Sequence, residues 1–221
     1  MEAASAPLPE LASVPWRSRE DAASLIRRGR LWMLFTSAHV VPFLLAAAGL
    51  MYLNVLAFPV AFVAAVHAWI IPELYAFRGA SVVRPKGPRN EGGEALAQGF
   101  LGDLLGHDAR ALQRDTGLVL ERGRLGVWLL GEGGALLVTP DRRAHAFCVR
   151  VSDNDLPPSD RIAHLLLALR SDEEGFATVA NHAFAGAAWR VRRRLDEPMR
   201  PALREALQQS VRGLPQPSTA L

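Results

Sequence analysis

A run of 41 residues without Asp, Glu, Lys or Arg, residues 31–71, constrains this chain more than any other feature of its sequence. One straight helix of that length would extend about 60 Å, roughly twice the hydrocarbon thickness of a bilayer. Within residues 46–62, Asn54 is the only strongly polar residue. A turn at Asn54 leaves two segments, residues 31–52 and 56–77, each long enough for one crossing. The sequence therefore predicts a transmembrane hairpin of two helices.

Two other structures could produce a long uncharged run, and both conflict with its length. A hairpin buried inside a soluble domain is one alternative, but soluble helices rarely extend this far without a polar face. A secretory signal is the other, because Arg27, Arg28 and Arg30 precede the run and Val66 and Ala68 resemble a small-residue cleavage site. The apolar part of a signal has about 7 to 15 residues, far fewer than precede Val66 here. The membrane hairpin is therefore the favoured interpretation.

Basic residues flank both ends of the run and predict its orientation. They are Arg17, Arg19, Arg27, Arg28, Arg30, Arg78, Arg84, Lys86 and Arg89. The turn carries none, so the positive-inside bias predicts both termini in the cytoplasm, at the plasma (inner) membrane of a bacterium. The expected partners are the lipid bilayer and a second protein or a second copy of the chain. The arginines expected to contact anionic lipid are Arg27, Arg28, Arg30, Arg190, Arg192, Arg193 and Arg194.

The composition narrows the classes of function. Cys148 is the only cysteine, so no internal disulfide can form. Lys86 is the only lysine, which argues against a Walker-type phosphate loop, a Schiff-base enzyme and a nuclease with a carboxylate and lysine core. The net charge is only +3, so no nucleic acid is expected as a partner. No motif predicts a cofactor, because GEGG at residues 131–134 is typical of a hairpin turn rather than a phosphate loop.

The sequence beyond the hairpin predicts an α+β domain. The expected segments are a disordered N-terminus (1–17), a basic helix with the transmembrane hairpin (18–78), a linker (79–93), a cytosolic α+β domain (94–195), and an amphipathic helix with a disordered tail (196–221). Helical spacing predicts a helix over 96–112 that stops at Gly117. Short apolar runs between turn sequences predict three or four antiparallel strands within 118–151. Helices over 159–170 and 172–184 are expected to help cover one face of this small sheet.

Small residues occupy one face of each predicted membrane helix. They are Ala38, Pro42, Ala46 and Gly49 in the first segment and Ala57, Ala61, Ala64, Ala65 and Ala68 in the second. Small faces allow two helices to approach closely in lipid, where apolar area alone does not drive association. The two faces are therefore expected to meet.

His39 and His67 form the first candidate pair for chemistry. Each lies 14 residues from Leu53, so a hairpin that turns there would place both imidazoles at a similar depth. An ionisable side chain within a membrane is a candidate for function, here metal binding, proton relay or binding of a quinone-like head group. A neutral histidine bonded to a neighbouring carbonyl or to Thr36 is the alternative, and such bonds are common.

Asp103 and His107 form the second candidate pair. At a spacing of i, i+4 on the predicted helix they would share a face and could hold a metal or act as acid and base. The sequence offers no recognisable third ligand, so an exposed helix face is the simpler interpretation and no metal site is predicted. Glu73, near the end of the second segment, is expected to pair with a nearby arginine, the candidates being Arg27, Arg30 and Arg78.

Two hypotheses for function follow. The first is a non-catalytic, membrane-anchored adaptor or regulatory subunit whose cytosolic domain binds a protein partner, because no catalytic constellation is evident. The second is a membrane-associated enzyme, or a protein that binds a small ligand or metal through His39 and His67 or through Asp103 and His107.

Overall fold

The computed structural model describes residues 17–85, 93–149 and 156–212. Its α-helices are α1 (Ala22–Leu53), α2 (Phe58–Ala80), α3 (Glu94–Leu104), α4 (His107–Thr116), α5 (Pro158–Ser171), α6 (Glu173–Val179), α7 (Ala188–Arg194) and α8 (Arg200–Val211), with short 3-10 helices η2 (Val55–Ala57) and η3 (Glu197–Met199). Its strands are β1 (Val119–Arg122), β2 (Val127–Gly131), β3 (Gly134–Val138), β4 (Arg143–Cys148) and β5 (Asn181–Ala187). Most of the predicted disordered N-terminus, the centre of the predicted linker and the predicted tail lie outside the described residues, in 1–16, 86–92 and 213–221.

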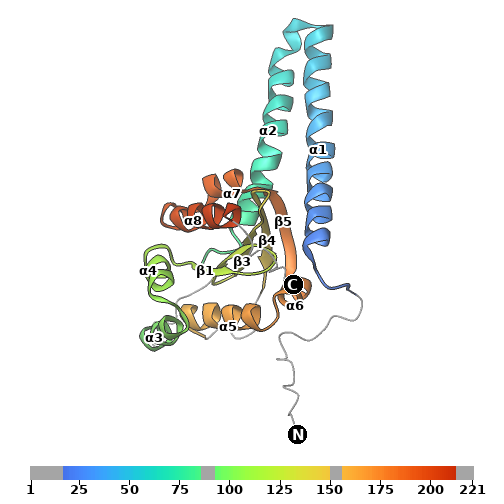
Figure 1. The fold of residues 1–221 in the computed structure, drawn as a ribbon. Helices are drawn as coiled ribbons and strands as arrows, with labels where there is room; N and C mark the ends of the chain where they lie inside the picture. Colours follow the sequence, from blue (N-terminus) through green and yellow to red (C-terminus); the bar gives the residue numbers. More distant parts are fainter. Residues whose placement is uncertain (1–16, 86–92, 150–155, 213–221) are drawn as a thin grey trace.

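Helices α1 and α2 form a hairpin that projects from one end of the domain (Figure 1). The turn lies where the sequence predicts it. The N–H of Asn54 donates to the carbonyl of Leu50 at 3.0 Å, which ends α1. The Oδ1 of Asn54 accepts from the N–H of Leu56 at 2.9 Å, which starts η2. Asn54 therefore satisfies a backbone group on each side of the turn, the carbonyl of Leu50 through its own backbone N–H and the N–H of Leu56 through its side chain.

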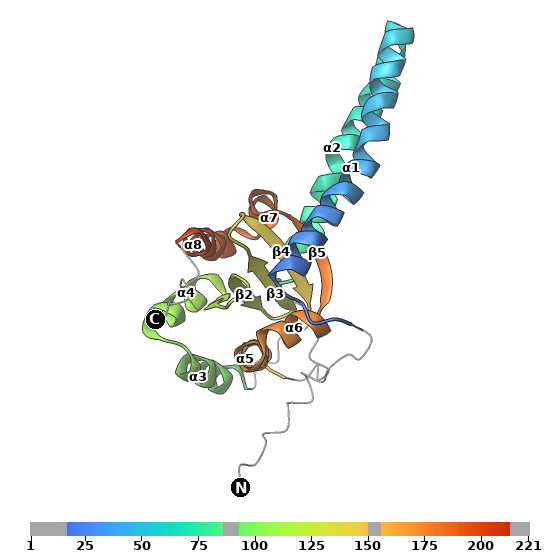
Figure 2. The ribbon, with the colours of Figure 1, turned by 45° about the vertical axis from the view of Figure 1, so that its right-hand side comes forward.

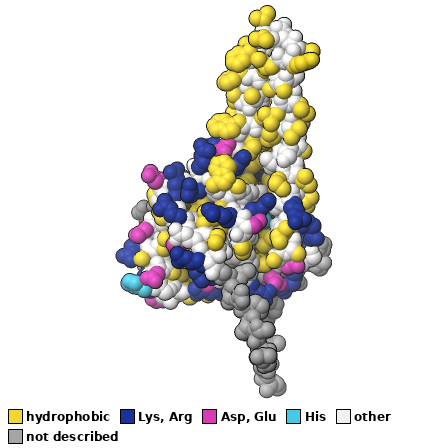
Figure 3. Space-filling model, turned by 45° about the horizontal axis from the view of Figure 1, so that its top comes forward, with side chains coloured by type: hydrophobic (Ala, Val, Ile, Leu, Met, Phe, Trp, Pro, Cys, Tyr) yellow, Lys and Arg dark blue, Asp and Glu magenta, His cyan; other side chains and the backbone are white. Residues whose placement is uncertain are grey.

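Both hairpin helices are long and apolar enough to cross a membrane. Many of their large apolar side chains face outward, as Leu45, Leu56 and Trp69 show with exposed fractions of 67%, 86% and 62%. Figure 3 shows apolar side chains over the hairpin and basic side chains gathered where it meets the domain. This exposure rules out the alternative in which the hairpin fills the core of its own chain.

The two predicted small faces do not meet, and the prediction for α1 is wrong. In the second segment, Ala57 of η2 and Ala61, Ala64 and Ala68 of α2 are buried or partly buried, as expected, whereas Ala65 of the predicted face is exposed. On α1, the predicted face of Ala38, Pro42, Ala46 and Gly49 is exposed. The least exposed residues of α1 beyond Leu31 are Trp32, Thr36, Val40, Ala47 and Leu50. This stripe lies on the same face of α1 as Leu25, which is buried in the domain. The packing of the first turns of α1 on the domain therefore determines which face of the helix is turned toward α2.

The domain is built on a five-stranded antiparallel sheet with the order β1-β2-β3-β4-β5. The prediction of strands within 118–151 is confirmed by β1 to β4. The predicted helix over 172–184 is wrong in its second half. Helix α6 ends at Val179, and the residues after Ala180 form β5, which pairs with β4. His182 therefore lies on an edge strand and not on a helix.

Helices cover both faces of the sheet, which corrects the expectation that they cover one. Trp128 and Leu130 of β2 pack in a cluster with side chains of α5 and α6. Leu129, between them, packs on the opposite face with side chains of α2, α7 and α8. Every residue of β2 and β3 is buried. A sheet covered on both faces has nearly continuous apolar runs, which is the pattern these strands show in the sequence.

The foot of the hairpin, meaning the first turns of α1 and the last turns of α2, packs against the edge strand β5, which lies between the two helices (Figure 2). Leu25 of α1 belongs to the core on one face of the sheet, and Ala76 and Ala80 of α2 belong to the core on the other. Gly79 approaches β5 so closely that a Cβ there would lie 2.6 Å from Cδ1 of Phe184. The hairpin is therefore fixed to the domain on both sides of the sheet.

Three boundaries differ from those predicted. The helix expected over 96–112 is two helices, because the chain becomes extended at Leu105 before Gly106, a poor helix former. The described part of the predicted linker, 79–85, is packed, with Val82 and Val83 buried in the core beside α2. The amphipathic C-terminal helix is confirmed as α8, but it packs on the sheet and so belongs to the domain.

Candidate functional site

A β-bulge in the edge strand brings two histidines together. Phe147 of β4 lies opposite His182 of β5. The preceding residue of β4, Ala146, lies opposite Phe184, so β5 carries one residue more than β4 between these pairs. Residues directly opposite each other share a face of a sheet, so His182 and Phe184 face opposite sides. In a regular strand they would share one face. The bulge therefore turns His182 toward His145, the β4 residue on the same face as Phe147.

The two imidazoles are in direct contact. Nδ1 of His145 lies 3.2 Å from Nε2 of His182, and His145 is only 1% exposed. Burial lowers the pKa of His145 from 6.5 to about 4. Burial, followed by the neighbouring His145, lowers the pKa of His182 from 6.5 to about 3. Both rings are therefore neutral at pH 7, and one ring N–H donates a hydrogen bond to the other ring nitrogen.

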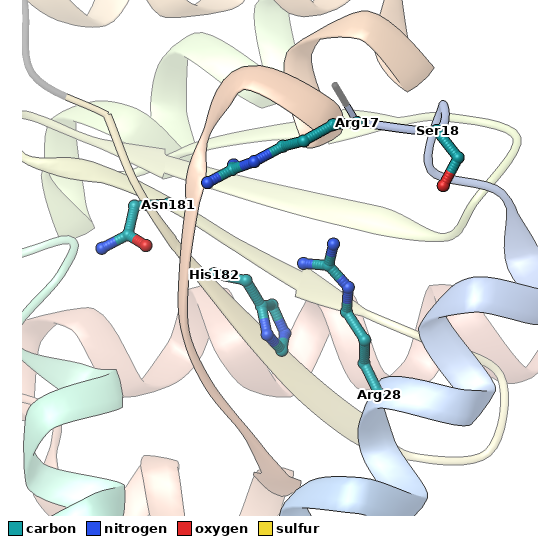
Figure 4. A pocket seen from close by; sticks show the side chains of 5 residues that line it. All are labelled: Arg17, Ser18, Arg28, Asn181 and His182. Carbon is teal, nitrogen blue, oxygen red and sulfur yellow. The ribbon is translucent and has the colours of Figure 1, made fainter. Parts of the chain in front are cut away.

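A pocket of about 380 Å³ opens beside His182. It is lined by Arg17, Ser18, Arg28, Asn181 and His182. Figure 4 shows Arg28 extending from α1 toward His182, while Arg17 extends toward β5 from the segment that precedes α1. The volume is within the range of small-molecule sites, at its lower end. The packing of the hairpin against β5 thus forms a pocket from two distant parts of the sequence, residues 17–28 and residues 181–182.

The arginines of this pocket are held by other buried or partly buried groups. Arg28 pairs with Glu20, whose side chain is only 4% exposed. The other carboxylate oxygen of Glu20 accepts from the hydroxyl of Ser24 at 2.7 Å. Arg17 Nη1 donates to the carbonyl of Thr178 at 3.3 Å. Among the described residues that line the pocket there is no carboxylate, so the site presents positive charge together with N–H and O–H groups.

His39 and His67 each bond within their own helix. In both, Nδ1 lies 2.8 Å from the carbonyl oxygen four residues earlier. The ring of His67 stacks on Phe43 at 5.6 Å, whereas the ring of His39 packs against Tyr75 at 6.4 Å. Phe43, the ring beside His67, lies four residues or about one helical turn after His39 in α1. The alternative of a histidine bonded to a neighbouring carbonyl is what the structure shows.

Asp103 and His107 lie on different helices. Asp103 is in α3, with Oδ1 3.5 Å from Nη2 of Arg110, and His107 begins α4. The predicted shared face does not exist, because the helix is interrupted between them. Across residues 17–85, 93–149 and 156–212, no group of three or more His, Cys, Asp or Glu side chains is arranged to hold a metal ion.

Glu73 has a partner that the sequence did not predict. Its carboxylate Oε2 accepts from Nε and Nη2 of Arg194 at 2.8 and 2.6 Å. The expected partners were Arg27, Arg30 and Arg78. The pair joins α2 to α7, two helices far apart in sequence that pack on the same face of the sheet.

The arginines predicted to contact lipid fall into different settings. Arg27 and Arg30 are exposed at the foot of α1, while Arg28 lines the pocket. On α7, Arg192 is exposed, Arg194 is engaged by Glu73, and Arg190 and Arg193 lie 5.0 and 6.0 Å from the ring of Trp189. Arg27, Arg30 and Arg192 are therefore exposed, whereas Arg194 is engaged within the protein.

Comparison of the chain with models of protein families, with characterised proteins and with solved structures gives no match. The function of the pocket therefore rests on its own geometry. From the sequence, Arg28 was predicted to contact lipid and His182 to lie on a helix. Nothing in the sequence predicted that the two residues line one pocket. One local signal was present, because the polar residues Asn181 and His182 interrupt the apolar pattern of the predicted helix.

Proposed function

We propose that this chain is an integral membrane protein of the plasma (inner) membrane that acts as a non-catalytic, membrane-anchored adaptor or regulatory subunit. The hairpin crosses the bilayer and returns, so that both termini are cytoplasmic and Asn54 is on the outer side. Exposed arginines at its foot, among them Arg27, Arg30 and Arg78, contact anionic head groups. Each such contact contributes about 1 kcal/mol.

The observation that carries this proposal is the packed junction between hairpin and domain. Leu25 of α1 and Ala80 of α2 end in the cores on opposite faces of the sheet. The pair of Glu73 and Arg194 adds a link between α2 and α7. A domain mounted in this way keeps one height and one orientation above the bilayer, whereas a domain on a flexible linker does not. A binding surface in a fixed place is what an adaptor requires.

Helix α3 offers that surface at the end of the domain farthest from the hairpin (Figures 1 and 2). Ala97 and Leu101 are buried on the side of α3 that packs toward α5. Leu96 and Phe100 are 70% and 62% exposed, and their spacing of four residues places them on one face. Apolar anchors at this spacing are typical of helices that dock on a protein partner.

Crosslinking of the full chain after mild detergent extraction tests this proposal. We expect a stoichiometric adduct with a partner protein, or with a second copy of the chain. The double variant Leu96→Ser/Phe100→Ser should reduce the yield of that adduct about fivefold or more, because each exposed anchor contributes about 1 to 2 kcal/mol when it is buried in an interface. Immunoblotting of the membrane fraction measures the yield.

Val211→Ser is the matched control, since Val211 is 60% exposed at the end of α8 and lies outside the proposed surface. It should leave the adduct unchanged. A wild-type chain that is recovered only as a lone monomer would contradict the adaptor proposal, as would equal loss of the adduct in the control. The second hypothesis, which assigns chemistry to His39 and His67 or to Asp103 and His107, gains no support from the contacts described above.

A further inference from the structure

The pocket beside His182 has a lining suited to an anion. Arginine carries only N–H donors, and the hydroxyl of Ser18, the amide of Asn181 and an imidazole N–H supply further donors. The guanidinium groups of Arg17 and Arg28 come from separate elements and approach from different directions (Figure 4). A carboxylate has two oxygens to engage such a set, whereas inorganic phosphate or a phosphomonoester offers at least three strong acceptor oxygens and a charge of up to −2.

The guanidinium groups of the pocket are held in position by other groups of the protein. Glu20 holds Arg28, and the carbonyl of Thr178 holds Arg17. One carboxylate oxygen of Glu20 pairs with Arg28, and the other accepts a hydrogen bond from Ser24. Side chains held in place before binding lose less conformational freedom when the ligand arrives.

The histidine pair can supply one further donor. Since Nε2 of His182 faces Nδ1 of His145, the other nitrogen of His182, Nδ1, is the one left for a bound group. If Nδ1–H of His145 donates to Nε2 of His182, then His182 carries its own proton on Nδ1. In that tautomer His182 donates toward an anion while both imidazoles remain neutral.

The position of the pocket indicates where the anion comes from. Arg28 lies three residues before Leu31, where the uncharged run begins. If the hairpin spans the bilayer as proposed above, the pocket lies beside the head groups of the inner leaflet. A lipid source therefore rests on the proposed membrane span, whereas binding of a soluble phosphate compound does not.

We propose that the pocket formed by Arg17, Ser18, Arg28, Asn181 and His182 binds a phosphate group, carried either by the head group of an anionic lipid or by a free phosphate compound. The shared recognition is charge-assisted hydrogen bonding from two arginines.

Titration of the full chain in a phosphate-free detergent with inorganic phosphate, followed by calorimetry, tests a free phosphate compound as the source. Arg17→Gln should weaken binding about 10-fold or more, because it removes a charged donor from the ligand. Arg17 is chosen because Arg28→Gln would also leave the buried Glu20 without its partner. Arg19→Gln is the control, since Arg19 is close in sequence and carries the same charge but pairs with Asp172 and does not line the pocket. It should change the affinity by less than about twofold, and acetate should bind more weakly than phosphate.

Addition of phosphatidic acid or phosphatidylcholine to the same micelles tests a lipid head group as the source. If phosphatidic acid raises the melting temperature of the wild type and of Arg19→Gln but not of Arg17→Gln, the pocket takes a lipid head group. If inorganic phosphate binds with the expected dependence on Arg17 and neither lipid has this effect, the ligand is a free phosphate compound. The proposal is overturned if neither probe depends on Arg17, or if Arg19→Gln weakens binding as much as Arg17→Gln. None of these outcomes tests whether the hairpin spans the membrane, which is measured separately by thiol labelling.

Discussion

Arg194→Ala should lower the free energy of unfolding by about 3 to 5 kcal/mol. Arg194 donates two hydrogen bonds to Glu73, whose side chain is only 7% exposed. Removal of the guanidinium leaves a carboxylate buried without its partner, and the desolvation of that charge is no longer offset. Denaturant unfolding of the purified chain in mild detergent, followed by tryptophan fluorescence, measures the change.

Arg192→Ala is the matched control, because Arg192 lies on the same helix, α7, and is exposed. The same change in net charge should alter stability by no more than about 0.5 kcal/mol there. The double variant Glu73→Leu/Arg194→Leu should recover much of the loss, since it removes both charges and leaves apolar volume. Equal destabilisation by the two single variants would show that the pair of Glu73 and Arg194 does not join α2 to the domain.

Acidification should destabilise the domain through its histidine pair. In the folded chain the pKa is lowered to about 4 for His145 and about 3 for His182, while an unfolded histidine has a pKa near 6.5. Below about pH 6.5 the unfolded state therefore binds more protons than the folded state, so the stabilising contribution is complete above that pH and is lost as the pH falls toward 4. Between pH 7.5 and 5 we expect a loss on the order of 3 kcal/mol from the pair.

The pH dependence is measured from unfolding curves at several pH values between 7.5 and 5, above the range where most carboxylates titrate. In His145→Gln/His182→Gln the slope of stability against pH in this window should be much smaller than in the wild type. His164→Gln, which changes an exposed histidine on α5, should keep the wild-type slope. A wild-type stability that is constant across the window would show that the two imidazoles are not buried as a neutral pair.

The hairpin could be predicted from the sequence because its signal is local. The length of the uncharged run and the position of Asn54 depend only on neighbouring residues, and the observed turn lies at that residue. Strands β1 to β4 could be predicted for a similar reason, because turn sequences separate their apolar runs. Strand β5 was not, because Ala183, Ala185 and Ala187 have a high intrinsic helix propensity that pairing with β4 overrides.

The candidate pocket depends on relations that one sequence does not display. Arg17 and Arg28 meet His182 only because the foot of the hairpin encloses β5, and His182 faces that side only because of the bulge. Sheet register and an extra residue in an edge strand follow from tertiary contacts. The pair of Asp103 and His107 illustrates the reverse error, since a spacing of four residues means a shared face only while the helix is continuous.

Thiol labelling of intact cells tests most directly whether the hairpin crosses the membrane and returns. Single cysteines are introduced as Asn54→Cys or Gln208→Cys into Cys148→Ser, and the cells are treated with a membrane-impermeant maleimide. Asn54 is exposed at the tip of the hairpin, and Gln208 is exposed on α8. We predict that Asn54→Cys is labelled in intact cells and that Gln208→Cys is labelled only after the membrane is opened. Labelling of Gln208→Cys in intact cells, or of Asn54→Cys only after the membrane is opened, would contradict the membrane hairpin.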